Sequence, residues 1–126
     1  MSNQTAKAKI LYVDNDPMMC KLVPSFFDRQ GLQVRAASNG HEGVEIALEW
    51  LPDLILMDLM MPTMDGLQAT EALRAEPRTQ QIPIVAYTVV PEASMHARAQ
   101  EAGINGFISK SSPLTEVIRL LSTYLP

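Results

Sequence analysis

Acidic side chains come directly after two short apolar runs of the sequence. The first run, ILYV, is followed by Asp14, Asn15 and Asp16, and the second, DLILM, is followed by Asp58. Clustered carboxylate and amide oxygens suit a hard cation such as Mg²⁺ or Mn²⁺. A carboxylate beside such a cation can attack phosphorus and form an acyl phosphate. These residues therefore indicate a site for phosphate chemistry, provided that the fold brings them together.

A hydroxyl and an ammonium group end two later apolar runs. Thr88 ends the run IPIVAYT, and Lys110 follows the run GFIS. Lys110 could hold phosphoryl oxygens through its charge, and Thr88 through a hydrogen bond. Taken singly, Asp58 could be a turn cap, Thr88 an ordinary turn residue and Lys110 a solvated charge. Only their coincidence on one edge of a sheet favours a functional site.

The elements that must position these residues follow from hydrophobic periodicity. Short apolar runs alternate with longer amphipathic segments, and two runs are almost continuously apolar, which is typical of strands covered on both faces. This alternation predicts an α/β fold, a doubly wound five-stranded parallel sheet with five helices. Right-handed crossovers place all the strand C-termini on one edge, where such sheets carry their sites. The predicted strands are 9–13, 33–37, 53–57, 82–88 and 106–109, and the predicted helices are 17–30, 41–51, 65–75, 92–102 and 114–125.

Several residues mark the ends of the predicted helices. Asp16 stands just before Pro17, which is the arrangement of an N-cap followed by a first-turn proline. Pro24 lies inside the first helix, and because it removes one backbone hydrogen bond we expect a kink there. Gly31 and Gly103 stand where helices should end.

Length and composition restrict the function classes. The 126 residues fit one domain, residues 1–126, in which we expect 1–8 to be a flexible N-terminal extension. The net charge of −4 with scattered basic residues argues against direct nucleic-acid binding. We find no run long enough for a membrane span and expect a soluble, cytoplasmic protein. His41 and His96 are expected to be isolated and exposed, which argues against a histidine metal site.

These motifs resemble those of response-regulator receiver domains, the phosphoacceptors of two-component signalling. The resemblance lies in DLILMDLMMPTMDG with VDND upstream, Thr88 after IVAY, and GINGFISK downstream, and it extends from about Lys9 to Leu125. It implies the flavodoxin-like (βα)5 arrangement. It also implies that Asp58 accepts a phosphoryl group from a phosphohistidine of a sensor histidine kinase or a histidine phosphotransfer protein.

The resemblance assigns roles to further residues. It implies that Asp14, the Asn15 position, Asp58 and the main-chain carbonyl of Met60 bind Mg²⁺. Thr88 then corresponds to the switch hydroxyl, Phe107 to the aromatic switch residue and Lys110 to the site lysine. Phosphorylation would shift an inactive–active equilibrium and alter the face built from the predicted segments 92–102, 106–109 and 114–125. We expect that face to serve a target protein, a kinase or a second copy in a homodimer.

This sequence departs from the family pattern at three places. Asn15 stands where an acid is usual, which predicts weaker Mg²⁺ binding because the amide brings no charge. Asp16 could compensate by binding the metal, but its position before Pro17 favours a helix cap. Ser111 replaces the usual proline after Lys110, so we expect a trans peptide bond there. Apolar Met60, Val89 and Val90 flank the phosphoacceptor position, which predicts slow self-dephosphorylation.

Two alternatives remain beside the receiver interpretation. ILYVDND also resembles the first motif of haloacid-dehalogenase-type phosphatases, in which Asp14 would be the nucleophile. Asn15 favours instead a receiver-like interaction module that works without phosphorylation. Under the preferred interpretation the protein is not an enzyme, but a phosphoacceptor that assists its own phosphorylation and slow dephosphorylation. The chain would act either alone or as part of a larger regulator with an output domain.

Overall fold

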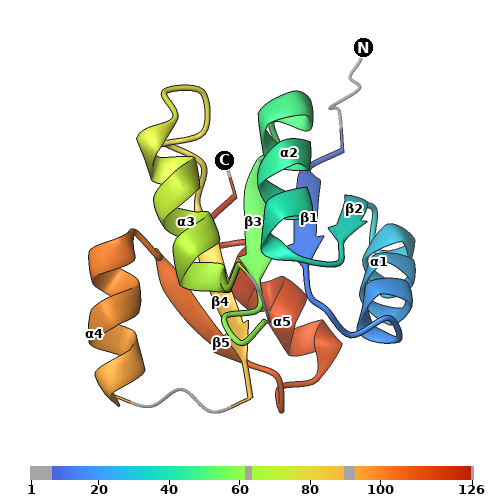
Figure 1. Cartoon of the computed structure of the whole chain (residues 1–126). Helices are drawn as coiled ribbons and strands as arrows, with labels where there is room; N and C mark the ends of the chain where they lie inside the picture. The colour runs from blue at the N-terminus through green and yellow to red at the C-terminus, as the bar shows by residue number, and fades with distance from the viewer. Residues whose placement is uncertain (1–6, 62–63, 90–92, 126) are drawn as a thin grey trace.

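One parallel sheet and five helices make up the part of the chain that the structure describes (Figure 1). The computed structural model describes residues 7–61, 64–89 and 93–125. Along the sheet the strand order is β2-β1-β3-β4-β5, so the chain reverses its direction of travel across the sheet after β2. The strands are β1 (Lys9–Val13), β2 (Gln33–Ala37), β3 (Leu54–Met57), β4 (Ile84–Thr88) and β5 (Gly106–Ser109), and the helices are α1 (Met19–Arg29), α2 (Gly40–Trp50), α3 (Gly66–Ala75), α4 (Ala93–Ala102) and α5 (Leu114–Leu121).

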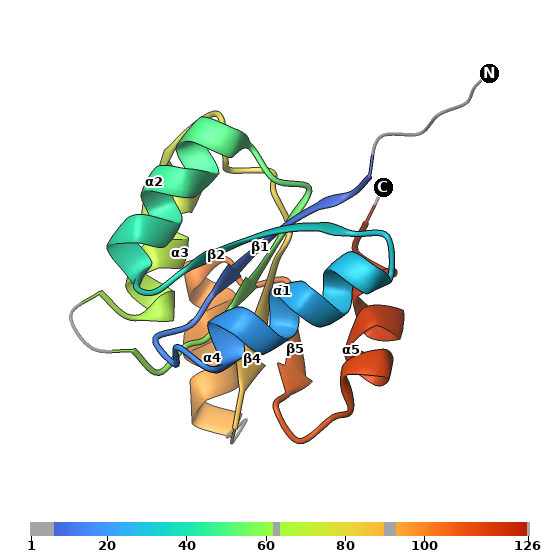
Figure 2. The same cartoon turned by 90° about the vertical axis from the view of Figure 1, so that its right-hand side faces the viewer.

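Helices cover both faces of the sheet, as the continuous apolar strands require. Figure 2 shows α1 and α5 on one face and α2 and α3 on the other, with α4 beside α3. Alternate strand residues feed two separate cores. On β1, Ile10 and Tyr12 join the core under α1 and α5, whereas Leu11 and Val13 join the core under α2, α3 and α4. The predicted doubly wound α/β fold is therefore confirmed. No helix within the described ranges combines the length and apolar character needed to span a bilayer.

The first helix starts later than predicted and continues through its proline. Helix α1 begins at Met19, two residues after Pro17, and contains Pro24 without interruption. Asp16 Oδ1 accepts the backbone N–H of Met18, and its carbonyl accepts the N–H of Cys20, both at 3.0 Å. Asp16 therefore bonds to the turn that leads into α1, whereas the residue directly before the helix is Met18, which makes no side-chain cap hydrogen bond. Gly31 follows α1 and Gly103 follows α4, as predicted, with φ values of 85° and 111°.

The last helix is shorter than predicted. Helix α5 ends at Leu121, not at residue 125, because two hydroxyl side chains bond back to the carbonyls of its last turn. Ser122 Oγ donates to the carbonyl of Arg119, and Thr123 Oγ1 donates to the carbonyl of Leu120. The peptide bond between Lys110 and Ser111 is trans, as predicted.

Arg74 connects several elements at the edge of the sheet where the strands begin. From the last turn of α3, its guanidinium donates to the carbonyl of Gly103 at 2.9 and 3.1 Å and to the carbonyl of Ile82 at 2.8 Å. It also donates to Asn105 Oδ1 at 2.8 Å, and the same oxygen accepts the N–H of Ile84. Burial lowers the pKa of Arg74 below its ordinary value. One side chain thus joins α3 to the segments that lead into β4 and β5.

A glycine allows α3 to begin directly against the loop that carries Asp58. A Cβ at Gly66 would lie 2.5 Å from the carbonyl oxygen of Asp58 and 2.8 Å from Cα of Leu59. Both are backbone atoms, so they cannot move aside as a flexible side chain would. Gly66 therefore sets how closely the helix approaches the acidic loop.

Substitution of Gly66 should consequently destabilise the fold. We expect Gly66→Ala to lower the free energy of unfolding by about 2–3 kcal/mol, measured by urea denaturation, because overpacking displaces backbone. Gly31→Ala is the control, since a Cβ there meets nothing within 4 Å and only the positive φ is unfavourable. It should cost about 1 kcal/mol. Equal effects of the two substitutions would contradict the steric role of Gly66.

Candidate active site

Three of the charged residues singled out in the sequence meet at the carboxyl edge of the sheet. Lys110 Nζ lies 2.8 Å from Asp14 Oδ2 and 3.5 Å from Asp58 Oδ2. Backbone hydrogen bonds extend the strand ladders into these residues: the N–H of Asp58 donates to the carbonyl of Val13, and the N–H of Lys110 to that of Thr88. The side chains are therefore positioned by the sheet itself.

Asp14 is fully buried, and both of its oxygens accept hydrogen bonds. Oδ2 accepts from Lys110 Nζ at 2.8 Å and from the Tyr12 hydroxyl at 2.5 Å, and Oδ1 accepts the N–H of Asp16 at 3.0 Å. Burial alone would raise the pKa of Asp14, but the hydrogen bonds from Lys110, Tyr12 and Asp16 outweigh it. The pKa therefore lies below its ordinary value, and Asp14 is the firmly ionised carboxylate of the site.

Asp58 is held less tightly than Asp14. Its Oδ1 accepts the N–H of Met60 at 3.1 Å, and the residue is 5% exposed. Burial raises the pKa of Asp58, the Met60 N–H and Lys110 oppose this, and the negative charge of Asp14 adds to it. Burial alone would lower the pKa of Lys110, but its contacts with Asp14 and Asp58 raise it, so the ammonium stays charged.

The remaining oxygen donors predicted for a cation lie around this pair. Asn15 and Asp16 are exposed, and Met60 follows Asp58 on the loop after β3. Within the described ranges, no three His, Cys, Asp or Glu side chains gather closely enough to form a metal site by themselves. Two carboxylates, one amide and one main-chain carbonyl are nevertheless hard oxygen donors of the kind Mg²⁺ takes while keeping several waters. The residues present fit such an ion.

Thr88 and Phe107 lie on the two strands beyond β3. Thr88 is buried at the end of β4 and pairs with Ser109 of β5. Phe107 is half-buried, and its ring stacks on the imidazole of His96 with centroids 3.9 Å apart and an interplanar angle of 6°. The prediction that His96 is isolated and exposed is therefore wrong. His96 and buried Ala99 are three residues apart on α4, a spacing that could have placed both on the inner face.

Two tyrosines beneath the site were not identified from the sequence. Tyr12 and Tyr87 are buried neighbours on β1 and β4, with ring centroids 6.1 Å apart in an edge-to-face arrangement. Burial raises the pKa of both hydroxyls. Tyr12 and Asp14 are two residues apart on an extended segment, and that period places both side chains on one face. The apolar pattern of ILYV alone does not indicate the contact of the Tyr12 hydroxyl with Asp14.

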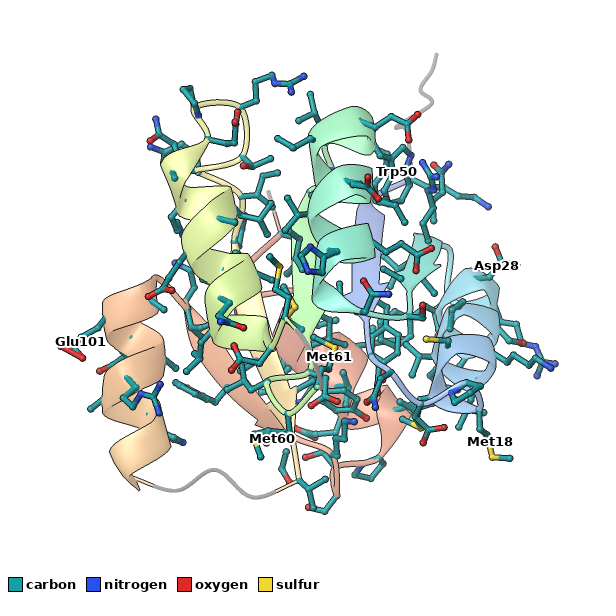
Figure 3. All side chains as sticks on the ribbon, in the orientation of Figure 1. Met18, Asp28, Trp50, Met60, Met61 and Glu101 are labelled. Carbon is teal, nitrogen blue, oxygen red and sulfur yellow. The ribbon has the colours of Figure 1, made fainter. Side chains whose placement is uncertain are left out.

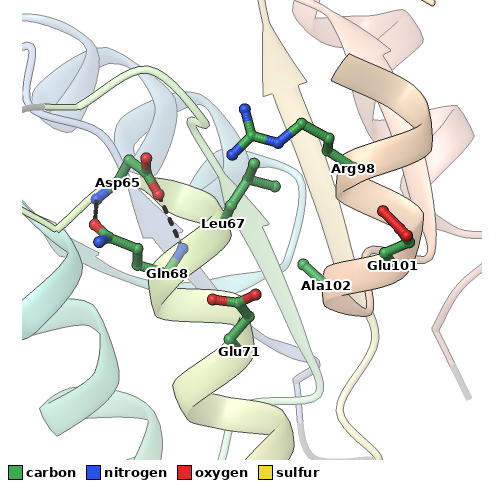
Figure 4. Close-up of a pocket in the computed structure, with 7 residues that line it drawn as sticks. All are labelled: Asp65, Leu67, Gln68, Glu71, Arg98, Glu101 and Ala102. Atoms are coloured by element: carbon green, nitrogen blue, oxygen red, sulfur yellow. Dashed lines mark hydrogen bonds between the residues drawn. The ribbon is translucent and has the colours of Figure 1, made fainter. Parts of the chain in front are cut away.

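A cavity of about 360 Å³ between α3 and α4 is separate from this site. Figure 4 shows the capping box at the start of α3 on its border, in which Asp65 and Gln68 exchange side-chain and backbone hydrogen bonds. None of the predicted site residues lines it. The lining residues are Asp65, Leu67, Gln68, Glu71, Arg98, Glu101 and Ala102.

Because Asp14 and Asp58 are both buried, the negative charge of Asp58 should lower the stability of the fold. Because the pKa of Asp58 is raised on folding, its ionised form costs stability at pH values above its ordinary pKa of 3.8. With metal removed by EDTA at pH 7, Asp58→Asn should raise the free energy of unfolding by on the order of 1 kcal/mol. The difference should shrink as the pH falls toward 4, because the wild-type carboxyl then becomes protonated.

The matched control is Asp28→Asn, which removes one negative charge from an exposed position at the end of α1. It should change the free energy of unfolding by less than about 0.5 kcal/mol. A loss of stability in Asp58→Asn at pH 7 would show that Lys110 stabilises Asp58 more than burial and Asp14 destabilise it.

Comparison with known proteins is consistent with this geometry. The family model of the response regulator receiver domain matches residues 10–122. PilH of Pseudomonas aeruginosa is 29% identical over 118 residues, which cover 94% of this chain and 98% of PilH. The histidine-protein kinase BarA of Escherichia coli is 32% identical over 117 residues, 93% of this chain. The chain spans only 13% of the length of BarA.

Solved structures show the same arrangement. The chemotaxis protein CheY4 of Vibrio cholerae superposes with a TM-score of 0.92 at 25% identity, covering 95% of this chain and all of that one. The receiver domain of a sensor histidine kinase from Pseudomonas aeruginosa, which has a magnesium ion coordinated in its active-site cleft, superposes with a TM-score of 0.86 at 28% identity. That match covers 94% of this chain and 98% of that one. The chain therefore belongs to the response regulator receiver domains, the phosphoacceptor modules of two-component signalling.

Proposed function

We propose that Asp58 accepts a phosphoryl group from a phosphohistidine of a histidine kinase or a histidine phosphotransfer protein. The observation that carries this proposal is the difference between the two carboxylates. Asp14 is fully buried with both oxygens bonded, whereas Asp58 retains some exposure, and among the described residues its Oδ2 has only the 3.5 Å contact with Lys110. Lys110 stands close to both of them, where its charge can offset that of an incoming phosphoryl group.

Phosphoryl transfer exchanges one bond to phosphorus for another. An oxygen of Asp58 forms a bond to phosphorus while the bond from phosphorus to the donor imidazole nitrogen breaks. The bonding electrons stay with the imidazole, which takes up a proton from solvent. Lys110 and the Thr88 hydroxyl hold the oxygens of the transferred group. When bound, Mg²⁺ supplies charge neutralisation for the phosphoryl oxygens, and the residues that would hold it are Asp14, Asp58, the Asn15 amide and the Met60 carbonyl.

Phosphorylation would change the surface of the protein beyond β4, at the β5 edge of the sheet. Thr88 and Phe107 would act as the switch residues, and the face would comprise α4, β5 and α5. The stack of Phe107 on His96 supports this, because it joins β5 to α4 directly. A target, an output domain or a second copy of the chain could bind that face. Homodimerisation, the absence of nucleic-acid and membrane contacts, and the cytoplasmic location stay predictions.

The phosphorylated state should be long-lived, because the exposed side chains on the neighbouring loops are apolar. Met60 and Val89, on the loops after β3 and β4, are 65% and 69% exposed, and apolar side chains cannot orient an attacking water. Val90 lies outside the described residues. Met18 at the start of α1 is also exposed, and Figure 3 shows Met18 and Met60 directed outward at the carboxyl edge. We propose that the phosphodonor contacts these exposed apolar side chains when it docks at the carboxyl edge.

The two alternatives are less well supported. In a phosphatase that used Asp14 as nucleophile, the attacking oxygen would have to be accessible, yet Asp14 is buried and accepts hydrogen bonds on both oxygens. An interaction module without phosphorylation would need Lys110 only to neutralise two buried carboxylates, and it would not account for the exposure that Asp58 retains. In our proposal the protein acts on no substrate other than its own phosphodonor and phosphoryl group.

One labelling experiment separates these functions. The protein is incubated with Mg²⁺ and acetyl phosphate, and any acyl phosphate is located by mass spectrometry. We expect a label on Asp58 that is absent from Asp58→Asn and requires Mg²⁺. A label on Asp14 would support the phosphatase, and no label at saturating Mg²⁺ would support the interaction module.

Asn15 leads to a separate prediction about the cation. Asn15→Asp adds a carboxylate beside Asp14 and Asp58 and should lower the Mg²⁺ dissociation constant roughly tenfold. The measurement is a calorimetric Mg²⁺ titration without a phosphodonor. The control is Asp16→Asn, which removes a charge but keeps an acceptor for the N–H of Met18, and it should shift the constant by less than about twofold. An unchanged affinity in Asn15→Asp would mean that Asn15 does not face the ion.

A further inference from the structure

Tyr12 lies beneath the site, inside the core covered by α1 and α5. Its hydroxyl donates a hydrogen bond of 2.5 Å to Asp14 Oδ2. A buried phenol needs a hydrogen-bond partner, so this contact alone would be explained as the satisfaction of a core tyrosine. The other contacts of the same oxygen give it a second role.

Tyr12 shares Asp14 Oδ2 with Lys110, whose Nζ is 2.8 Å from it. Lys110 Nζ also lies 3.5 Å from Asp58 Oδ2, so the ammonium stands between the two carboxylates. If Lys110 turns toward the phosphoryl oxygens when Asp58 is phosphorylated, its contact with Asp14 lengthens. A buried carboxylate that loses its cation without other donors is strongly destabilised.

We infer that Tyr12 is a positioning residue for phosphoryl transfer, which keeps Asp14 hydrogen-bonded and oriented while Lys110 moves to the phosphoryl group. This inference rests on the proposed function of Asp58. The Tyr12 hydroxyl reaches Asp14 from within the core, so its hydrogen bond does not require Lys110. The N–H of Asp16 holds the other oxygen at 3.0 Å. Tyr12 is thus the donor that remains on Oδ2 when the ammonium leaves.

The chain provides a matched control beside Tyr12. Tyr87 is equally buried and packs edge-to-face on the Tyr12 ring. Its hydroxyl forms no hydrogen bond with another described residue, and its ring lies 5.7 Å from Lys110 Nζ. Tyr87→Phe therefore keeps the packing and the contact of the ring with the ammonium. Tyr12→Phe keeps the packing but removes the hydrogen bond to Asp14.

The first test compares the rate of phosphorylation with Mg²⁺ affinity in the wild type and in these two variants. With acetyl phosphate, Tyr12→Phe should lower the rate constant of phosphorylation roughly tenfold, which is typical of a lost hydrogen bond to a charged group. Its Mg²⁺ dissociation constant, measured without a phosphodonor, should stay equal or become smaller, because the charge of Asp14 is less neutralised. Tyr87→Phe should match the wild type in both.

The second test observes the hydrogen bond directly by proton NMR. A slowly exchanging phenol proton should be present in the wild type and in Tyr87→Phe but absent from Tyr12→Phe. It should persist when Mg²⁺ and beryllofluoride, a mimic of the phosphoryl group, are added. Loss of the resonance on that addition would overturn the inference, because Tyr12 would then leave Asp14 together with Lys110.

The kinetic outcomes distinguish the inference from the proposed function. If Tyr12→Phe and Tyr87→Phe are phosphorylated equally fast on Asp58, the inference fails and the proposed function stands. If Tyr12→Phe loses both rate and Mg²⁺ affinity, the substitution has distorted the site, and the positioning role is also refuted. If the wild type takes no label on Asp58, the proposed function itself fails.

Discussion

The ammonium group of Lys110 lies between two carboxylates, Asp14 and Asp58, that the fold removes almost completely from water. Two carboxylates that contact the same ammonium group repel each other by several kcal/mol in a protein interior, so burial of the pair requires a cation or a shared proton. The surrounding structure answers this constraint unequally. Among the described residues, Asp14 receives three hydrogen-bond donors and is firmly ionised, whereas Asp58 receives one backbone N–H and a longer contact from Lys110.

Topology explains how residues far apart in the chain come to share one cation. Strands β1 and β3 are neighbours with Val13 opposite Met57, so the residues that follow them, Asp14 and Asp58, are adjacent by register. Lys110 follows β5, which lies two strands from β3 and three from β1, so its side chain must cross β4 to reach Asp58 and also β3 to reach Asp14. Its Nζ lies over the ring of Tyr87, the β4 residue on the same side of the sheet. The length of a lysine side chain suits this distance.

The sequence predicted β1, β3 and β4 closely because parallel strands that are buried on both faces are nearly continuous in apolar residues. All five strands lie within the predicted ranges. It also predicted which charged residues meet, since parallel strands share one edge. It did not predict the partners approaching from behind, such as Tyr12 below Asp14 and His96 against Phe107, because an aromatic residue in an apolar pattern reads equally well as core. The early end of α5 was missed because hydroxyl residues that cap a helix can also continue it.

The Arg74 contacts at the opposite edge of the sheet have a mechanical consequence. One guanidinium holds α3, the start of β4 and the turn before β5 through hydrogen bonds to backbone carbonyls and to Asn105. The ends of α4 and β5 near Arg74 should stay fixed, because neither element can translate there without breaking several hydrogen bonds at once. Any rearrangement that begins at Asp58 should therefore tilt the carboxyl ends of these elements about a fixed base. Displacement would grow with distance from Arg74 and be largest at the loops a partner protein could reach.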